Sequence, residues 1–325
     1  MCDDLGRMQR TTAHLRETDI HSFLDPIIQR DPGWRLWLTL LEATQREIKG
    51  PAWVTAVPRL KPDRPAGAPL LAKATVLLRP RLARRWVRRL LTQAGQSPPR
   101  PEAQEVAANA RGFDALAILK AAIGQDEPRL VSLAKEAGID RAVLEALTHL
   151  AALPLLQACT RALQHQLPAA WPYGYCPVCG SWPTLAELRG IERTYRLRCA
   201  RCGGDWGMPL LHCPYCGQSD HRHLGALVPE NRGETRKVAF CMTCKGYLKV
   251  LTTLQGSPGD ALIRDDLETI DLDLAALERG YCRPKHPGYA LNIDLALPPS
   301  RLRTFFGWRT GTKRSNKNYD DFTPC

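Results

Sequence analysis

Four pairs of cysteines constrain this chain more than any other feature of its sequence. The pairs are Cys176 and Cys179, Cys199 and Cys202, Cys213 and Cys216, and Cys241 and Cys244. Two thiolates separated by two residues can hold one ion from a single tight turn, and two such turns complete a tetrahedron. Zinc takes four thiolates in this way, and iron accepts the same geometry. The spacing therefore predicts two metal sites, with these eight cysteines as the ligands and iron or zinc as the ion.

The sequence leaves two ways of grouping the pairs. Sequential grouping leaves 19 residues between the turns of one site and 24 between those of the other, which is room for a β-hairpin. Interleaved grouping, first pair with third and second with fourth, would give a cross-braced domain. Sequential grouping is favoured because each spacer carries its own strand pattern.

Glycine follows each pair at close range. It comes directly after Cys179, Cys202 and Cys216, and one residue after Cys244. A turn that wraps backbone N–H groups around a sulfur tends to need a positive φ, which glycine adopts at little cost. We therefore expect glycine to supply the positive φ in all four turns.

Redox catalysis is a weaker explanation of the same motifs. A thioredoxin-like site has one CxxC between a strand and a helix, whereas these four lie among strands and glycines. A four-thiolate ion also leaves no open position for a substrate. No Ser-His-Asp or P-loop pattern appears in the sequence. We predict that the protein is not an enzyme.

The expected compartment is the cytoplasm. The stretch "MCDDLGRMQRTTAHLRETD" lacks the apolar core of a secretory signal. The sequence also shows no run of about 18 apolar residues, so no transmembrane helix is expected. In the cytoplasm, the 12 cysteines are more suited to metal binding than to disulfides.

The predicted fold class is α+β, with a helical N-terminal domain followed by two small zinc-ribbon-like β modules. Residues 1–168 show helical periodicity, as in "WRLWLTLLEATQREIK", and a helical stretch around residues 69–95 is expected to break at Pro80. Residues 169–210 form the first four-cysteine module and residues 211–297 the second, which includes a closing helix. Residues 298–325 are predicted to be a disordered tail. In the first module, "IERTYRLRC" predicts a strand that buries Ile191, Tyr195 and Leu197.

Several side chains outside the cysteine pairs have competing interpretations. Trp182, Trp206 and Tyr247 are expected in the small cores of the modules. Asp265, Asp266 and Glu268 precede the expected closing helix, where N-capping is favoured over partner recognition. The histidines beside the third pair are not expected to be ligands, because four cysteines fill each site. They are His212, His221 and His223.

A basic segment, "RPRLARRWVRR", carries part of the net charge of +12. Four of its arginines share one helical face: Arg81, Arg84, Arg85 and Arg88. A solvated face is the favoured interpretation, ahead of contact with an acidic partner. Nucleic acid is least favoured, because no companion stacking platform is apparent.

The cysteine pairs and the residues around them resemble the formate dehydrogenase accessory protein FdhE family. The resemblance covers residues 100–290 and depends on "YCPVCGSWPTLAEL", "LRCARCGGDWGMPLLHCPYCG" and "CMTCKGYLKVL", followed by "DDLETIDLDLAALERGYCRP". All eight cysteines of the family pattern are present. The remaining cysteines, Cys2, Cys159, Cys282 and Cys325, lie outside it.

The resemblance implies a structure and a role. It implies that the two β modules are rubredoxin-like and hold two iron ions, one per four-cysteine site. It also implies a cytoplasmic accessory protein that binds the catalytic, molybdopterin- and selenocysteine-containing subunit of formate dehydrogenase before twin-arginine export. The alternative from the residues alone is a zinc-ribbon nucleic-acid-binding protein, which the net charge and spacing allow. The sequence does not indicate an oligomeric state.

Overall fold

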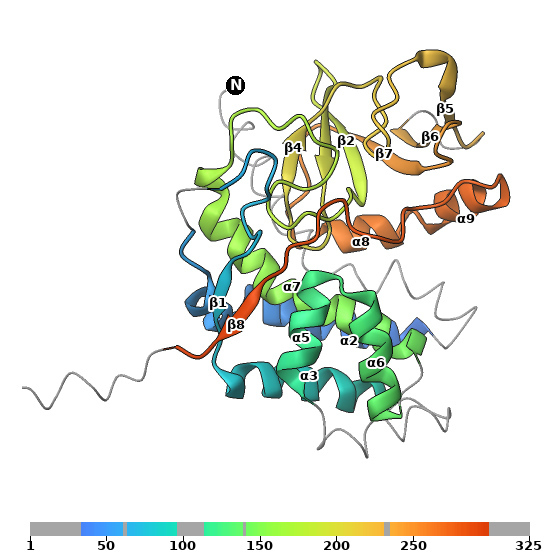
Figure 1. Cartoon of the computed structure of the whole chain (residues 1–325). Coiled ribbons are helices and arrows are strands. Elements are labelled where there is room, and N and C mark those ends of the chain that lie inside the picture. Colours follow the sequence, from blue (N-terminus) through green and yellow to red (C-terminus); the bar gives the residue numbers. More distant parts are fainter. Residues whose placement is uncertain (1–33, 61–63, 96–113, 139–140, 231–234, 299–325) are drawn as a thin grey trace, which may run out of the picture.

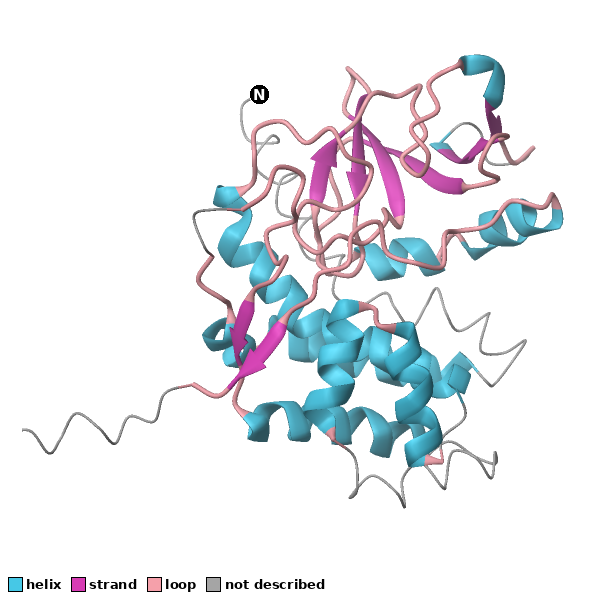
Figure 2. Cartoon of the chain, in the orientation of Figure 1, coloured by secondary structure: helices cyan, strands magenta, loops and turns pink. Residues whose placement is uncertain are grey.

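The computed structural model describes residues 34–60, 64–95, 114–138, 141–230 and 235–298. A layer of helices lies beneath a β-sheet (Figures 1 and 2), which confirms a mixed helix and sheet fold. The boundaries predicted at residues 168, 210 and 297 stay predictions. The predicted tail from residue 299 onward, with Cys2 and Cys325, lies outside the described residues.

The helical layer is built around one long helix, α7 (Arg141–Leu163). Its neighbours α2 (Trp34–Lys49), α3 (Pro80–Gly95), α5 (Ala115–Gly124) and α6 (Glu127–Ala137) all contact it. Short 3-10 helices, Pro51–Ala56 and Gln164–Gln166, follow α2 and α7. Residues 143–166 are apolar and long enough to cross a membrane by composition, but 78% of an apolar 18-residue window within them is buried inside the protein. Such burial is what the core helix of a helical layer requires.

A short strand interrupts the stretch for which helix is predicted. Strand β1 (Thr75–Leu77) pairs in parallel with β8 (Asp294–Ala296), and Pro80 begins α3 instead of breaking a helix. Proline suits a first helical position because the amide that it lacks would have no partner there. The helical prediction was wrong here because the partner strand lies near the other end of the chain, where local periodicity cannot reveal it.

The six-stranded sheet joins both cysteine regions. Its order is β4-β3-β2-β7-β6-β5. The strands are β2 (Leu185–Arg189), β3 (Thr194–Arg198), β4 (Asp205–Gly207), β5 (Leu224–Leu227), β6 (Arg236–Cys241) and β7 (Tyr247–Thr253), with the 3-10 helix His221–His223 before β5. Neighbours are antiparallel except β2 and β7, which pair in parallel with Leu185 opposite Lys249. The two predicted modules therefore share one sheet.

One predicted core residue of the first module is exposed. Tyr195 and Leu197 are buried, but Ile191 lies in the turn between β2 and β3 with 95% of its surface exposed. The alternating pattern runs on into the turn, so the pattern alone places the strand start too early.

The closing helix is split in two, α8 (Leu262–Leu267) and α9 (Ile270–Glu278). Asp266 is inside α8 and caps no helix, so its predicted capping role was wrong. It binds Lys249 of β7, whose Nζ lies 2.6 Å from Asp266 Oδ1 and 2.7 Å from Asp273 Oδ2. Arg283 binds the same two carboxylates, at 2.7 and 2.9 Å. We call these four side chains the Lys249 network.

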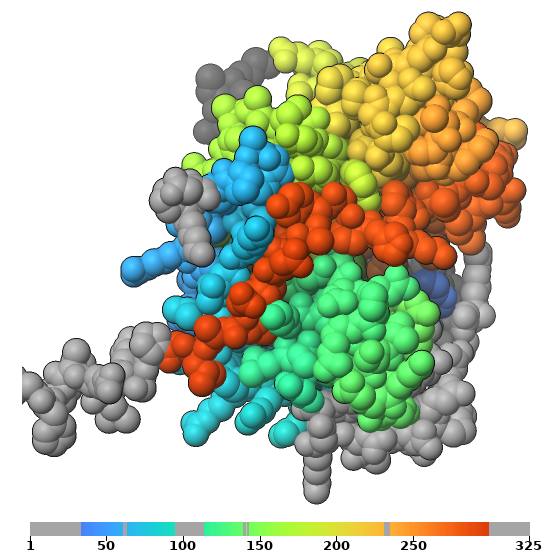
Figure 3. All heavy atoms as spheres, in the orientation of Figure 1, coloured from blue at the N-terminus to red at the C-terminus, as the bar shows by residue number. Residues whose placement is uncertain are grey.

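A single hydrophobic core extends from the helices to the first two cysteine pairs. It includes Trp86, Leu119 and Leu153 of the helical layer together with Cys176 and Cys202. A separate small core under the second region contains Val238, Tyr247, Leu272 and Ala276. The chain after α9 runs across the surface between the helical layer and the cysteine region before reaching β8 (Figure 3).

Candidate metal centres

The structure groups the cysteine pairs sequentially. The first cluster is Cys176, Cys179, Cys199 and Cys202, and the second cluster is Cys213, Cys216, Cys241 and Cys244. Within each cluster the four sulfurs lie within 4.8 Å of one another. This is the grouping that the strand patterns favoured, and the interleaved alternative was wrong.

The sulfur spacing fits one ion per cluster. The measured Sγ–Sγ distances are 3.4 and 3.5 Å in the first cluster and 3.6 and 3.8 Å in the second. Four sulfurs at about 2.3 Å from a central zinc would be about 3.8 Å apart in a regular tetrahedron. Each cluster can therefore hold one four-thiolate ion, so that the chain can bind two. That these eight cysteines are the ligands stays a prediction.

Each cluster is assembled from two turns of the same design. In the first turn, Gly180 N donates to Cys176 O at 2.9 Å, and Cys176 N donates to Ser181 O at 2.8 Å. The turns that begin at Cys199 and Cys213 repeat both bonds. The residue four positions after the first cysteine has a positive φ in every turn. These residues are Gly180 (71°), Gly203 (77°), Gly217 (76°) and Lys245 (57°).

The fourth turn therefore departs from the prediction. Lys245, and not a glycine, takes the positive φ. Gly246 is needed for a different reason, because a Cβ there would lie 2.5 Å from the Tyr215 ring and 3.2 Å from Cys244 Sγ. The sequence showed a glycine near the turn but not which constraint it meets.

The two clusters differ in their access to solvent. All four cysteines of the first cluster are buried, with at most 1% of their surface exposed. In the second cluster, Cys213 and Cys241 are buried, whereas Cys216 and Cys244 reach the surface. An ion in the first cluster would be enclosed by the common core, and an ion in the second would sit at the edge of the protein.

The chemistry of the buried cluster favours a cation. Burial raises the pKa of Cys176 and Cys202 well above that of a free thiol, since desolvation opposes a thiolate. Hydrogen bonds from the neighbouring thiols, with a smaller contribution from Arg201, hold the pKa of Cys179 well below that value. Arg201 offsets at most one of the four thiolate charges, whereas a divalent or trivalent ion bound by them would offset two or three more.

Aromatic rings connect the two clusters. Trp206 and Tyr247 are buried, as predicted. The Trp182 ring packs edge-on against Tyr175, at a centroid distance of 6.2 Å, and against Tyr215, at 5.4 Å. Tyr175 precedes the first cysteine pair and Tyr215 lies within the third, so the contact bridges two turns. Neither tyrosine was predicted to pack there, although the position of each beside a cysteine was a visible signal.

Histidine takes no part in either cluster among the described residues. His221 and His223 lie instead near Asp220, with Nδ1 atoms 3.8 and 3.5 Å from its carboxylate oxygens. That the third pair needs no histidine ligand stays a prediction.

Protein purified without added metal is expected to contain two ions per chain, and a chelator should remove them in two phases. The ion of the second cluster should leave first, because Cys216 and Cys244 are accessible. The ion of the first cluster should leave only as fast as the chain unfolds. Elemental analysis and a time course with a chromogenic chelator measure both quantities. A Cys216→Ser control should lack the fast phase, and one ion per chain or a single phase in the unsubstituted protein would contradict the prediction.

Comparison with known proteins finds FdhE proteins among the relatives of this chain. No family model matches the chain. The chain is 32% identical to Protein FdhE of Escherichia coli O127:H6 over 111 residues, which are 34% of this chain and 35% of that protein. It is 33% identical to the FdhE homolog of Stutzerimonas stutzeri over 111 residues, 33% of this chain and 35% of the relative. The match thus spans about a third of the length of these curated relatives.

A solved structure extends the similarity to most of the fold. The crystal structure of the FdhE protein from Pseudomonas aeruginosa matches with a TM-score of 0.51 and 22% sequence identity. The match covers 79% of this chain and 89% of that chain. At this identity the likeness shows a shared fold.

Proposed function

We propose, from the support that these matches give to the FdhE family, that this chain is a metal-binding accessory protein for formate dehydrogenase. In this proposal it acts in the cytoplasm and binds the catalytic subunit before export. The observation that carries the proposal is the pair of four-cysteine clusters on one sheet, in a chain related to FdhE proteins. An ion held by four thiolates has no open position for a substrate, which supports a role other than that of an enzyme.

Iron is the ion that we propose for both clusters, with zinc as the alternative. Four thiolates in tetrahedral array suit either ion. Iron bound in this way colours the oxidised protein red through charge transfer from thiolate to ferric ion. A colourless protein with zinc alone, purified from its native host, would overturn the iron assignment and leave the accessory role standing.

The surface around the second cluster is the proposed contact for the catalytic subunit. Leu210 and Leu211 are exposed by 56% and 59% of their surface, and Met242 is also exposed. The two leucines line a groove of about 300 Å³, together with Tyr215 and Phe240. Exposed apolar side chains gathered at one place are typical of protein contacts, and a turn fixed by a metal loses little entropy on docking.

The arginine face of α3 has weaker support as that contact. Arg85 and Arg89 lie 3.0 and 3.9 Å from the Glu47 carboxylate. Arg81, Arg84 and Arg88 are exposed, as expected of a solvated helix face. Charges in this setting contribute little to binding at physiological salt.

Two variants with intact clusters test the proposed contact. Leu210→Asp with Leu211→Asp should lower capture of the catalytic subunit at least about tenfold, because it places two charges in an apolar contact. Changing Arg81, Arg84, Arg85 and Arg88 to Ala should leave most of the capture intact. The measurement is a pull-down of the purified subunit at near-physiological salt. The reverse result would assign the contact to α3. Failure of the unsubstituted chain to capture the subunit would contradict the proposed function itself.

The nucleic-acid alternative is not favoured. Arginines of the sheet that could contact phosphates are paired instead, Arg198 with Glu187 at 2.7 Å and Arg196 with Asp205 at 2.7 Å. A phosphate ligand would have to displace these carboxylates. Binding to nucleic acid that falls steeply with added salt would be evidence for the alternative.

A further inference from the structure

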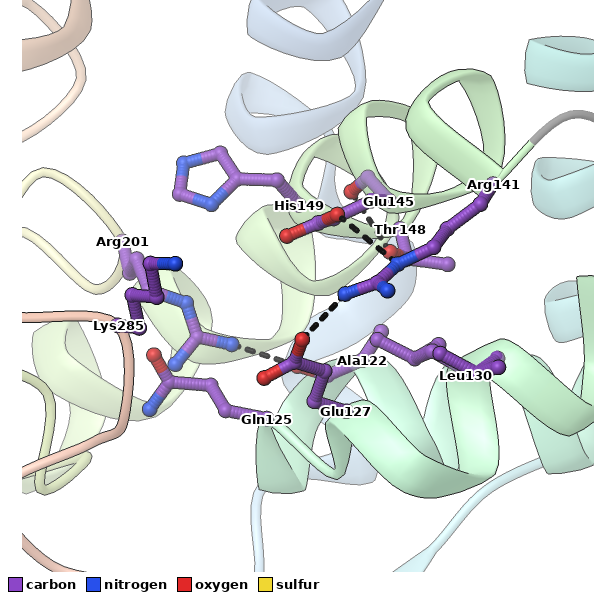
Figure 4. A pocket seen from close by; sticks show the side chains of 11 residues that line it. Ala122, Gln125, Glu127, Leu130, Arg141, Glu145, Thr148, His149, Arg201 and Lys285 are labelled. Atoms are coloured by element: carbon purple, nitrogen blue, oxygen red, sulfur yellow. Dashed lines mark hydrogen bonds and ion pairs between the residues drawn. The ribbon is translucent and has the colours of Figure 1, made fainter.

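A polar cavity lies where the helical layer meets the first cysteine region. Its lining includes Gln125, Glu127, Arg141, His149, Arg201 and Lys285 (Figure 4). Gln125 follows α5, Glu127 begins α6, Arg141 and His149 belong to α7, Arg201 lies in the turn between Cys199 and Cys202, and Lys285 follows α9. The cavity has a volume of about 160 Å³. This is smaller than sites for drug-sized ligands, which begin at about 300 Å³, so it can take one small group.

The acidic side chains of the cavity already have a partner. Arg141 Nη2 binds the Glu127 carboxylate, and Arg141 Nε lies 4.0 Å from Glu145 Oε2. Figure 4 shows the Arg141 guanidinium between the Glu145 and Glu127 carboxylates. Arg141 therefore offsets part of the negative charge, and among the described residues neither carboxylate forms an ion pair with Lys285 or Arg201.

Hydrogen-bond donors also line the cavity, on the side of the first cysteine region. Figure 4 shows Arg201, Lys285 and Gln125 side by side there. Arg201 is buried, with 5% of its surface exposed. It donates to Ser181 Oγ at 2.7 Å and to Ala122 O at 2.6 Å, which uses two of the five N–H groups of a guanidinium. Lys285 is exposed at the cavity and forms no ion pair with another described residue.

Gln125 adds an unsatisfied donor held by an unusual backbone. Its Nε2 is buried without a hydrogen-bond partner among the described residues. Its φ is 54°, a left-handed conformation, where its amide N–H closes the last turn of α5. A non-glycine residue in this conformation and a buried unpaired donor both cost free energy. Such costs are concentrated at binding sites, where a ligand can satisfy the donor.

We propose that this cavity binds a carboxylate group at its Arg201, Lys285 and Gln125 end. A carboxylate is planar and acceptor-only, and it can take bonds from a guanidinium, an ammonium and an amide at once. A doubly charged phosphate fits less well, because Glu127 and Glu145 line the same cavity and would repel the second charge. The carboxylate belongs either to a small free acid or to an acidic side chain of a bound polypeptide.

His149 does not change the charge balance at neutral pH. Desolvation by the surrounding protein lowers the pKa of the imidazole to about 4, and the positive charge of the nearby Arg201 lowers it further. The ring still meets solvent within the cavity. A neutral imidazole leaves Arg201 and Lys285 as the cations for the ligand.

Acetate is the probe for the test, observed by saturation-transfer NMR with the full chain. We expect saturable binding with a dissociation constant on the order of millimolar, the range open to so small a ligand. Lys285→Gln should weaken it about tenfold, the loss of one charge-assisted bond, and Gln125→Gly should weaken it while relieving the left-handed strain. Lys135→Gln, which removes an exposed charge from α6 outside the cavity, is the matched control and should bind as the unsubstituted chain does.

Two capped peptides distinguish the sources of the carboxylate. A Gly-Glu-Gly peptide that binds more tightly than acetate, with no binding of its Gln counterpart, supports an acidic side chain as the ligand. Acetate binding with exclusion of the peptide supports a free acid. Inorganic phosphate that binds as tightly as acetate would overturn the carboxylate assignment. Acetate binding that is absent, or that survives both Lys285→Gln and Gln125→Gly, would overturn the site.

Discussion

Substitution of Cys176 by Ser is expected to prevent the chain from reaching its native fold, with loss of helix as well as sheet. Structural zinc contributes about 10–16 kcal/mol in small metal-folded peptides, which is comparable with the whole stability of a domain, about 5–15 kcal/mol. The first cluster is buried in the same core as the helices, so its collapse exposes apolar surface of both layers. Circular dichroism and the soluble yield of the variant measure the effect.

Two cysteine variants serve as controls for this result. Cys216→Ser removes a ligand from the partly exposed second cluster and should leave most of the helix intact. Cys159→Ala changes a buried cysteine of α7 that belongs to neither cluster, and should cost no more than an ordinary core truncation. Native helix content in Cys176→Ser would show that the helical layer folds without the first cluster.

The part of the fold that Cys176→Ser is expected to disrupt is larger than the sequence alone suggested. The predicted division into a helical domain over residues 1–168 and two cysteine modules implied that the helical half stays folded when a module is lost. In the structure, the segment just before β1 contacts the first cysteine turn, with Leu70 N donating to Pro177 O at 2.8 Å and Leu71 N to Val178 O at 3.1 Å. Backbone pairing between distant segments leaves no periodic mark in either of them, so it could not be read from the sequence.

Replacement of Lys249 by Met is expected to destabilise the protein by about 3–5 kcal/mol, the usual cost of breaking a buried ion pair from one side. Lys249 is completely buried, and its ammonium is bound by both Asp266 and Asp273. Without it, Arg283 alone would face two carboxylates. The measurement is the free energy of unfolding in urea, on protein with both metal sites filled.

The control for Lys249→Met is Lys237→Met on the neighbouring strand. Lys237 is only partly buried, so its replacement should cost less than about 1 kcal/mol. Adding Asp266→Asn to Lys249→Met should cost less than the sum of the single changes, because the two residues interact. Equal effects of the two lysine substitutions would mean that the Lys249 network adds no stability.

The same network predicts sensitivity to acid. Burial by itself would raise the pKa of Asp266, but Arg283 and Lys249 outweigh this effect and hold the pKa below its usual value. The resulting stability is complete above the pKa of an unfolded aspartate, about 3.9. It is lost as the pH falls through the lower pKa of the folded state, and Asp266→Asn should remove this part of the acid dependence.

The local features of the candidate site were predictable, and its surroundings were not. The spacing of the cysteines, together with the glycines that follow three of the pairs, was sufficient to predict two clusters, because one turn fixes each pair. The parallel pairing of β2 with β7 could not be predicted, because the sequence pattern of a hairpin is the same whether or not a second hairpin pairs with it. The cavity at Arg201 was missed for a similar reason, because its residues come from separate helices, a cysteine turn and the segment after α9.

The pairing of β1 with β8 has a consequence for how the protein is made. Ribosomes release the N-terminal part first, and domains tend to fold in that order. Here Thr75 pairs with Asp294, and Lys73 N donates to Leu291 O at 2.7 Å, so the segment around β1 finds its partner only after residues 291–296 have been synthesised. Until then, β1 is an open strand edge on a nascent chain, the kind of feature that promotes aggregation. We therefore expect a chain that stops before residue 291 to depend on chaperones far more than a chain that includes β8.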